Sequence, residues 1–210
     1  MIHVEPQPEP EGFETKVRQK GLKDLRQKNI ALDRPLPTGI ELKPYWRDSL
    51  DDLHEKYRGV CAYLSVYIER VEGAASVDHF VAKSKRPDLI YEWSNYRLAC
   101  SVMNSRKREY EDVLDPFEIE DDWFRLPFEI EDDWFRLEPA SGRIYPNPEL
   151  GDPEKTAVQR TIDRLGLDDS GNREIRARRF YEYCTGGCDS DFLRKYSPFV
   201  YFEVVRNELL

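Results

Sequence analysis

The feature that most restricts the fold of this chain is a run of three short segments at its centre. Residues 75–80 and 96–99 are expected to form short strands, separated by a polar loop that contains Pro87. Residues 101–111 have the composition of a helix. We therefore expect a strand, loop, strand and helix unit, with polar side chains at the end of its first strand and in the first turn of its helix.

Four polar residues of this unit suit the hydrolysis of a phosphodiester bond. Asp78 and His79 end the first strand, Asn95 precedes the second, and Asn104 lies one turn into the helix. A carboxylate and an amide oxygen that face one another suit Mg²⁺, which prefers oxygen ligands and keeps several waters. A neutral imidazole can take a proton from water near pH 7. These residue types therefore predict a hydrolytic site with one divalent cation.

The same residues resemble the HNH endonuclease family, which uses the ββα-metal motif. The resemblance rests on VDHFVAKS at 77–84, WSNYRLAC at 93–100 and MNSRK at 103–107. It implies His79 as the general base, Asp78 and Asn104 as metal ligands, and Asn95 as the residue that orders the loop and the base. It also implies Mg²⁺ or Mn²⁺ as cofactor and DNA as substrate. The layout is similar to stand-alone bacterial HNH proteins, including those encoded beside ATPases in anti-phage defence systems.

The sequence departs from the family at the structural zinc that many HNH proteins bind with two C-x-x-C pairs. Leu64 and Met103 stand where the second cysteine of each pair would be, after Cys61 and Cys100. Two thiolates cannot supply the four ligands of a structural zinc, so no zinc is expected. The alternative is a four-cysteine site completed from the C-terminal region by Cys184 and Cys188.

The charge of the chain is unevenly distributed. The net charge is -9 and the pI about 5.0, which does not suit a nucleic-acid-binding surface as a whole. Residues 79–110, however, carry seven Lys or Arg and three acids, whereas residues 111–138 carry twelve acids and two Arg. The basic centre supplies the candidates for phosphate contacts: Lys83, Lys85, Arg106, Lys107 and Arg108.

Composition predicts the rest of the architecture. We expect an α+β fold, with a central ββα unit flanked by N-terminal and C-terminal helices. The expected segments are a loose tail at 1–12, helices within 13–59, the HNH core at 60–115, an acidic strand-containing segment at 116–150 and helices within 151–210. Residues 60–71 are rich in β-branched and aromatic types and predict a strand. No apolar run is long enough for a membrane span and no signal peptide is evident, so a cytoplasmic protein is expected.

An identical 11-residue sequence, PFEIEDDWFRL, occurs at 116–126 and again at 127–137. A single tandem copy of this length is not a solenoid unit, because such arrays need about three or more repeats of 20–50 residues. We interpret it as a duplication that the fold tolerates in a loop. Only one copy can occupy a given strand position, so the Trp-Phe pair of the other copy must find different cover.

Three functions remain open from the sequence, the last of them a zinc-dependent interaction domain. The first is a metal-dependent HNH endonuclease that hydrolyses DNA. The second is a nuclease-derived DNA-binding or regulatory subunit that is inactive alone and depends on a partner, such as an ATPase or another defence-system subunit. The net acidity, the missing zinc ligands and the tandem copy favour the second.

Overall fold

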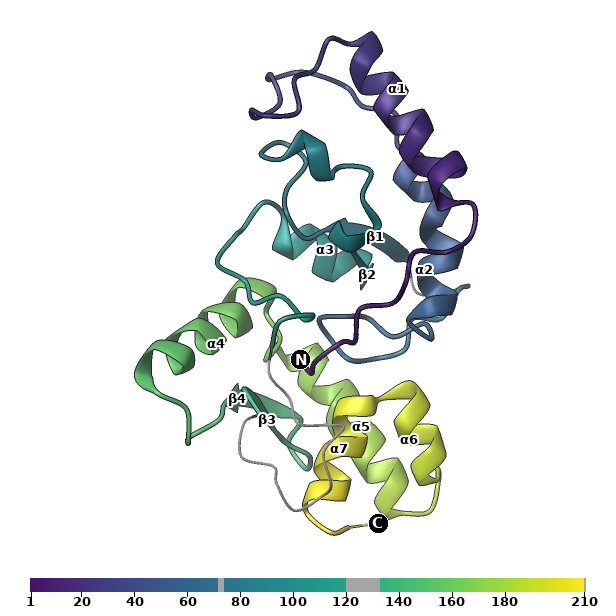
Figure 1. Cartoon of the computed structure of the whole chain (residues 1–210). Helices are drawn as coiled ribbons and strands as arrows, with labels where there is room; N and C mark the ends of the chain where they lie inside the picture. Colours follow the sequence, from purple (N-terminus) through teal and green to yellow (C-terminus); the bar gives the residue numbers. More distant parts are fainter. Residues whose placement is uncertain (72–73, 120–132, 210) are drawn as a thin grey trace. The chain divides into compact units, whose positions relative to one another are not determined.

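The computed structural model describes residues 1–71, 74–119 and 133–209 (Figure 1). The chain is α+β, as expected: its helices are accompanied by two small antiparallel sheets. It divides into two compact units, which are described separately. The site unit consists of Pro6–Gly59 and Ile68–Glu111, and the terminal unit of Met1–Glu5, Val60–Tyr67 and Asp112–Leu210. These units differ from the consecutive segments expected from composition, because residues 60–67 and 112–115 pack with the C-terminal region.

The centre of the site unit has the expected order of strand, loop, strand and helix. Strand β1 (Ala75–His79) pairs antiparallel with β2 (Tyr96–Cys100), with His79 opposite Tyr96. Helix α3 (Ser101–Lys107) follows β2 without a loop and packs on both strands (Figure 1). It is shorter than expected, because Arg108 adopts a positive φ of 49° and ends it. The loop between the strands contains two single turns of 3₁₀ helix, Pro87–Leu89 and Trp93–Asn95.

Two helical segments precede this unit, both within the expected range. The first is a π-helical stretch, Glu14–Arg18, that continues as α1 (Gln19–Gln27). The second is a 3₁₀ stretch, Tyr45–Ser49, that continues as α2 (Leu50–Lys56), which packs on β1 and β2.

Gly21 lies inside α1 and does not interrupt it. A Cβ atom at this position would lie 2.1 Å from Cγ of Tyr91, so the glycine lets the tyrosine ring pack against the helix backbone. This glycine therefore joins α1 to the loop that precedes β2.

The terminal unit contains the second sheet and the remaining helices. Strands β3 (Phe135–Glu138) and β4 (Arg143–Pro146) form an antiparallel hairpin. The helices that follow are α4 (Asp152–Leu165), α5 (Ser170–Cys184), α6 (Ser190–Tyr196) and α7 (Pro198–Arg206). Helix α4 packs on β4 and α7 on β3, while α5, α6 and α7 pack on one another. The C-terminal region is therefore helical, as expected.

The strand expected at residues 60–71 does not form. Val60 and Tyr67 make one isolated antiparallel bridge, and the residues between them form a tight turn. Ser65 has a positive φ of 54°, and its amide donates to the carbonyl oxygen of Cys61. Some of the β-branched and aromatic side chains that suggested a strand serve burial instead, since Tyr63 and Ile68 are buried.

The first residues have no helix or strand, but they are not a loose tail. In the terminal unit, Met1 is fully buried and the amide of Val4 donates to the carbonyl oxygen of Pro116 at 2.8 Å. In the site unit, the indole of Trp93 donates to the carbonyl oxygen of Gln7 at 2.7 Å. Burial and hydrogen bonds therefore fix a segment whose Pro and Glu content suggested disorder.

The tandem copies contribute different parts to the terminal unit. The second copy supplies Phe135, Arg136 and Leu137 of β3, with Phe135 and Leu137 buried. The first copy supplies Pro116–Ile119, of which Ile119 is buried. The question of where the Trp-Phe pair of the first copy finds cover lies outside the described residues.

Candidate functional site

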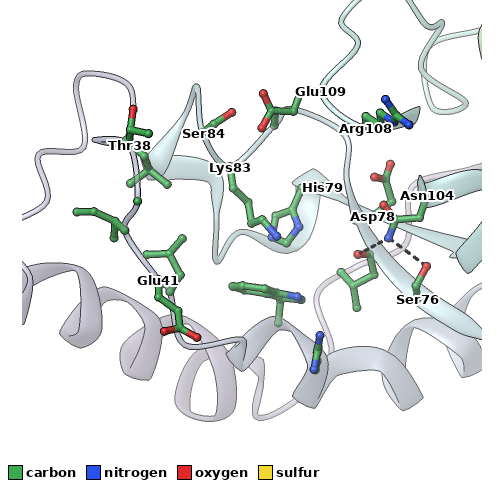
Figure 2. Close-up of a pocket in the computed structure, with 18 of the residues that line it drawn as sticks. Thr38, Glu41, Ser76, Asp78, His79, Lys83, Ser84, Asn104, Arg108 and Glu109 are labelled. Carbon is green, nitrogen blue, oxygen red and sulfur yellow. Dashed lines mark hydrogen bonds between the residues drawn. The ribbon is translucent and has the colours of Figure 1, made fainter. Parts of the chain in front are cut away.

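A cavity of about 1070 Å³ in the site unit brings together most of the residues singled out from the sequence. One wall is β1 with the first residues after it, and another is the loop at residues 36–42 (Figure 2). The beginning of the second helical segment and the end of α3 complete the lining. Asp78, His79, Lys83, Asn104 and Arg108 all lie on this cavity, although 30 residues of sequence separate the first from the last.

His79 is the last residue of β1 and is 6 % exposed. Its ring packs edge-on against Trp46 and Tyr96, with centroid distances of 5.1 Å to each. Its Nε2 lies 2.8 Å from the carbonyl oxygen of Ile90. A carbonyl oxygen can only accept a hydrogen bond, so Nε2 carries the hydrogen and Nδ1 is the basic nitrogen. Nδ1 forms no hydrogen bond with any described residue.

The surroundings of His79 favour the neutral imidazole. Burial, followed by the nearby positive charges of Lys83 and Lys107, lowers the pKa of His79 to about 3, against the smaller opposing effect of the hydrogen bond to Ile90. The ring is therefore uncharged throughout the physiological range. In that state Nδ1 can accept a proton without first losing one.

Asn95 holds the loop between β1 and β2 in place. Its Oδ1 accepts from the amide of Val81 at 2.8 Å, and its Nδ2 donates to the carbonyl oxygens of Val81 and Leu89 at 3.1 Å each. The residue is 5 % exposed and does not line the cavity. Its partner Val81 follows His79 by two residues, and its partner Leu89 precedes Ile90. Asn95 is therefore placed to order the loop rather than to contact a substrate.

Asp78 and Asn104 both line the cavity (Figure 2). The amide nitrogen of Asn104 donates to Oγ of Ser76 at 3.1 Å and to the carbonyl oxygen of Val77 at 3.2 Å. Since these acceptors fix which end of the amide is nitrogen, Oδ1 is the end left to bind a ligand. A carboxylate and an amide oxygen on one wall fit a hard cation that keeps water in its remaining positions. These two residues would hold Mg²⁺ or Mn²⁺.

Lys107 does not have the role that its sequence position suggested. Its side chain is 0 % exposed, and its Nζ donates to the carbonyl oxygens of His79 and Phe80 at 3.1 and 2.6 Å. The same ammonium lies 3.7 Å from Oδ2 of Asp78. A group enclosed in this way cannot reach a nucleic-acid phosphate, so the prediction that Lys107 binds nucleic acid is wrong. It positions the end of β1 instead.

The other cations predicted to contact phosphate lie in different surroundings. Lys83 and Arg108 line the cavity, and Figure 2 shows Lys83 extending beside the ring of His79. Lys85 is half-exposed and paired with Glu111 at 3.0 Å, away from the cavity lining. Arg106 is half-buried on α3 and does not line the cavity either. The structure thus brings two of the five predicted cations to the site.

Sequence reasoning missed the contribution of the segment before α2. Trp46 lines the cavity and its ring packs edge-on against that of His79. The Nζ atom of Lys83 lies 4.3 Å from the centroid of the Trp46 ring. Arg47 lines the same cavity and is close enough to lower the pKa of Lys83, which burial already depresses. The length of sequence between Trp46 and His79 hid this contact from local sequence patterns.

The four cysteines are free thiols, and Cys61 is buried while Cys184 is exposed. Within the residues that the structure describes, no group of three or more His, Cys, Asp or Glu side chains could hold a metal ion. The pair of Asp78 and Asn104 is a different kind of site, since one of its two oxygens belongs to an amide.

Comparison of the sequence with protein-family models and with curated proteins gave no match. No described helix is both long and apolar enough to cross a membrane.

Proposed function

We propose that this protein is a metal-dependent endonuclease of the HNH type that hydrolyses the phosphodiester bonds of DNA. The observation that carries the proposal is the state of His79. Its Nε2 hydrogen is engaged by the Ile90 carbonyl, which leaves a neutral Nδ1 as proton acceptor on a cavity also lined by Asp78 and Asn104. A proton acceptor and a pair of oxygen ligands in one cavity are what water-dependent cleavage of a phosphodiester requires.

In this proposal Nδ1 of His79 takes a proton from a water molecule as its oxygen forms a bond to phosphorus. The bond from phosphorus to the leaving oxygen breaks, and that oxygen takes a proton from solvent. The cation held by Asp78 and Asn104 would supply charge stabilisation at the phosphate and the leaving oxygen. Entry of the phosphate brings negative charge near the imidazole, which raises its pKa and makes it a stronger base.

The proposal includes the cellular location and the partner of the protein. We take the protein to act in the cytoplasm, with an ATPase or another defence-system subunit as its partner. The chain by itself would then bring the cleavage site, and the partner would bring recognition or activation.

The test is cleavage of supercoiled plasmid by the full chain with Mg²⁺ or Mn²⁺. The structure offers a matched pair of variants, because His54 is also buried and also places Nε2 against a backbone carbonyl, that of Ile68 at 2.9 Å. His54 does not line the cavity. We expect H79Q to lose at least 100-fold in cleavage rate and H54Q to retain most of the wild-type rate. Equal rates for the two variants would contradict the role of His79.

Failure of the wild-type chain to cut under any divalent ion would favour the regulatory subunit instead. That outcome would be tested further by adding the partner ATPase, where one is encoded beside the gene. Cleavage restored by the partner and abolished again by H79Q would place the chemistry in this chain.

A further inference from the structure

The cavity is lined by three cations that have no ion-pair partner at contact distance in the described part of the chain. Arg47, Lys83 and Arg108 form no ion pair with any described residue. Each comes from a different element: the turn before α2, the loop after β1 and the end of α3. All three line the cavity that holds Asp78 and His79. Lys83 interacts electrostatically with Asp78 and Glu109 but makes no ion-pair contact with either. Positive charge that no ion pair neutralises, placed around an expected phosphate position, indicates a site for anionic groups.

Two cations that follow Lys83 but lie outside the lining are paired with acids. Lys85 pairs with Glu111 at 3.0 Å and Arg86 with Asp88 at 2.6 Å. On the N-terminal helix, Arg18 pairs with three glutamates. The basic residues that follow Lys83 in the sequence therefore do not extend the unpaired positive charge of the cavity.

The cavity also has a second wall, opposite the one formed by β1 and the residues after it. The loop at residues 36–42 lines it, and the amide of Leu36 donates to the carbonyl oxygen of Ser84 at 2.7 Å. This hydrogen bond ties the loop to the segment that carries Lys83, so the two walls are joined at one end. Glu41 on the loop and Glu109 after α3 add negative charge to the lining (Figure 2).

The charge of the lining suits one strand better than two. Its ionised side chains are three cations and three carboxylates, one of which belongs to the metal pair. A duplex presents one phosphate charge per about 1.7 Å of axis, twice the density of a single strand. A second row of phosphates would meet Glu41 or Glu109 rather than further cations.

We propose that the substrate of this site is a single, unpaired nucleic-acid strand, held between the loop at 36–42 and β1 by Arg47, Lys83 and Arg108. This inference rests on the proposed function and narrows its substrate class. The recognised chemistry is one row of phosphodiesters without a paired complement, which single-stranded DNA, single-stranded RNA and looped regions of either share. Trp46 contributes by holding the ammonium of Lys83 over its ring.

The experiment measures binding and cleavage separately, with the full chain. Fluorescence anisotropy is recorded with oligonucleotides of one sequence as a single strand, as a hairpin loop and as a full duplex, each in DNA and RNA form. The same substrates are then incubated with Mg²⁺ or Mn²⁺ and their products resolved on gels. We expect the single strand and the loop to bind at least tenfold more tightly than the duplex, and cleavage to fall in unpaired positions.

Charge variants test the three cations directly. R47A and R108A remove exposed side chains, so they are expected to fold, which thermal melts would check. Each should lower the slope of log affinity against log salt by about 0.7 for the single strand. The matched control is R86A, which removes an exposed arginine outside the cavity lining and should leave the slope unchanged.

The outcomes separate this inference from the proposed function. Selective binding of the single strand without cleavage under any divalent ion would sustain the inference and count against the nuclease. Duplex bound or cut as well as the single strand would overturn the inference and leave the nuclease standing. Absence of binding to every oligonucleotide, or equal salt slopes for R47A and R86A, would also overturn it.

Discussion

The buried ammonium of Lys107 donates a hydrogen bond to the backbone carbonyl oxygen of His79, with a distance of 3.1 Å from Nζ to oxygen. It donates a second to the carbonyl oxygen of Phe80 at 2.6 Å. The last residue of α3 is thus bound to the point where β1 ends and the cavity loop begins. This contact fixes the direction in which the chain leaves the strand, and with it the setting of the His79 ring.

Replacement of Lys107 by methionine is expected to destabilise the fold strongly. K107M keeps the length of the side chain but leaves two buried carbonyl oxygens without a donor and Asp78 without its nearby cation. We expect the free energy of unfolding to fall by about 3 kcal/mol, as is usual when one partner of a buried charged group is removed. Urea denaturation would measure it.

The control for this prediction is Lys85, two residues after Lys83. Its side chain is half-exposed and its ion pair with Glu111 is at the surface, so K85M should cost less than about 1 kcal/mol. A K107M protein as stable as K85M would show that the hydrogen bonds of Lys107 do not stabilise the fold.

The buried imidazole of His79 predicts a specific pH dependence of stability. Its pKa is about 3 in the folded chain, whereas an unfolded histidine titrates near 6.5. Between these values the unfolded state binds a proton that the native state does not, so stability rises with pH across this window and is lost as the pH falls. The contribution approaches about 1.4 kcal/mol per pH unit.

Comparing the wild type with H79Q isolates this effect, because the carboxylates common to both proteins cancel in the difference. We expect the stability of H79Q to fall less steeply than that of the wild type between pH 6.5 and 4. Nitrogen NMR of the wild type should show the Nε2–H tautomer, with no titration of His79 near pH 6.5. A midpoint near 6.5 would contradict the buried neutral ring.

Asn95 is expected to act through the loop that it holds. In N95A the amide and the carbonyl oxygen of Val81 lose their partner, while the carbonyl oxygen of Leu89 keeps the amide of Glu92 at 3.4 Å. The expected cost is about 1–3 kcal/mol, as for buried polar groups left unsatisfied. Hydrogen exchange should quicken at residues 80–91 and remain unchanged in β3 and β4. Uniform acceleration across the whole chain would indicate general destabilisation rather than loosening of this loop.

Gly21 offers a prediction in which helix propensity and packing oppose one another. Alanine is favoured over glycine in a helix by about 1 kcal/mol, yet a Cβ at Gly21 would meet the Tyr91 ring at 2.1 Å. We expect G21A to be destabilised by about 1–3 kcal/mol, because a packed ring must move. Gly171 in α5 is the matched control, since nothing lies within 4 Å of its Cβ position, and G171A should be neutral or slightly stabilised.

The sequence predicted the centre of the fold because its signals there are local. Asp78 and His79 end a short strand, and Asn104 follows a second strand within one helical turn, so their meeting depends on few residues. Lys107 was misassigned because a lysine beside two arginines resembles a solvated face, and only the packing of α3 on β1 shows its burial. The loop at residues 36–42 and Trp46 reach the cavity through contacts over more than 30 residues, which no local pattern encodes.

The tandem repeat gives a prediction about redundancy. Removing residues 116–126 or residues 127–137 yields the same shortened protein, in which one PFEIEDDWFRL joins Asp115 to Glu138. That protein keeps the residue types of 116–119 after Asp115 and of 133–137 before Glu138, which are the described parts of the two copies. Each copy carries four acids and one arginine, so the net charge should change from -9 to about -6.

We therefore expect the shortened chain to form β3 and to melt cooperatively within a few degrees of the full chain, as followed by circular dichroism. In the shortened chain only two residues separate the positions of Ile119 and Asp133, so their Cα atoms can lie at most about 11 Å apart. Loss of the cooperative transition would show that the terminal unit needs the spacing that both copies provide.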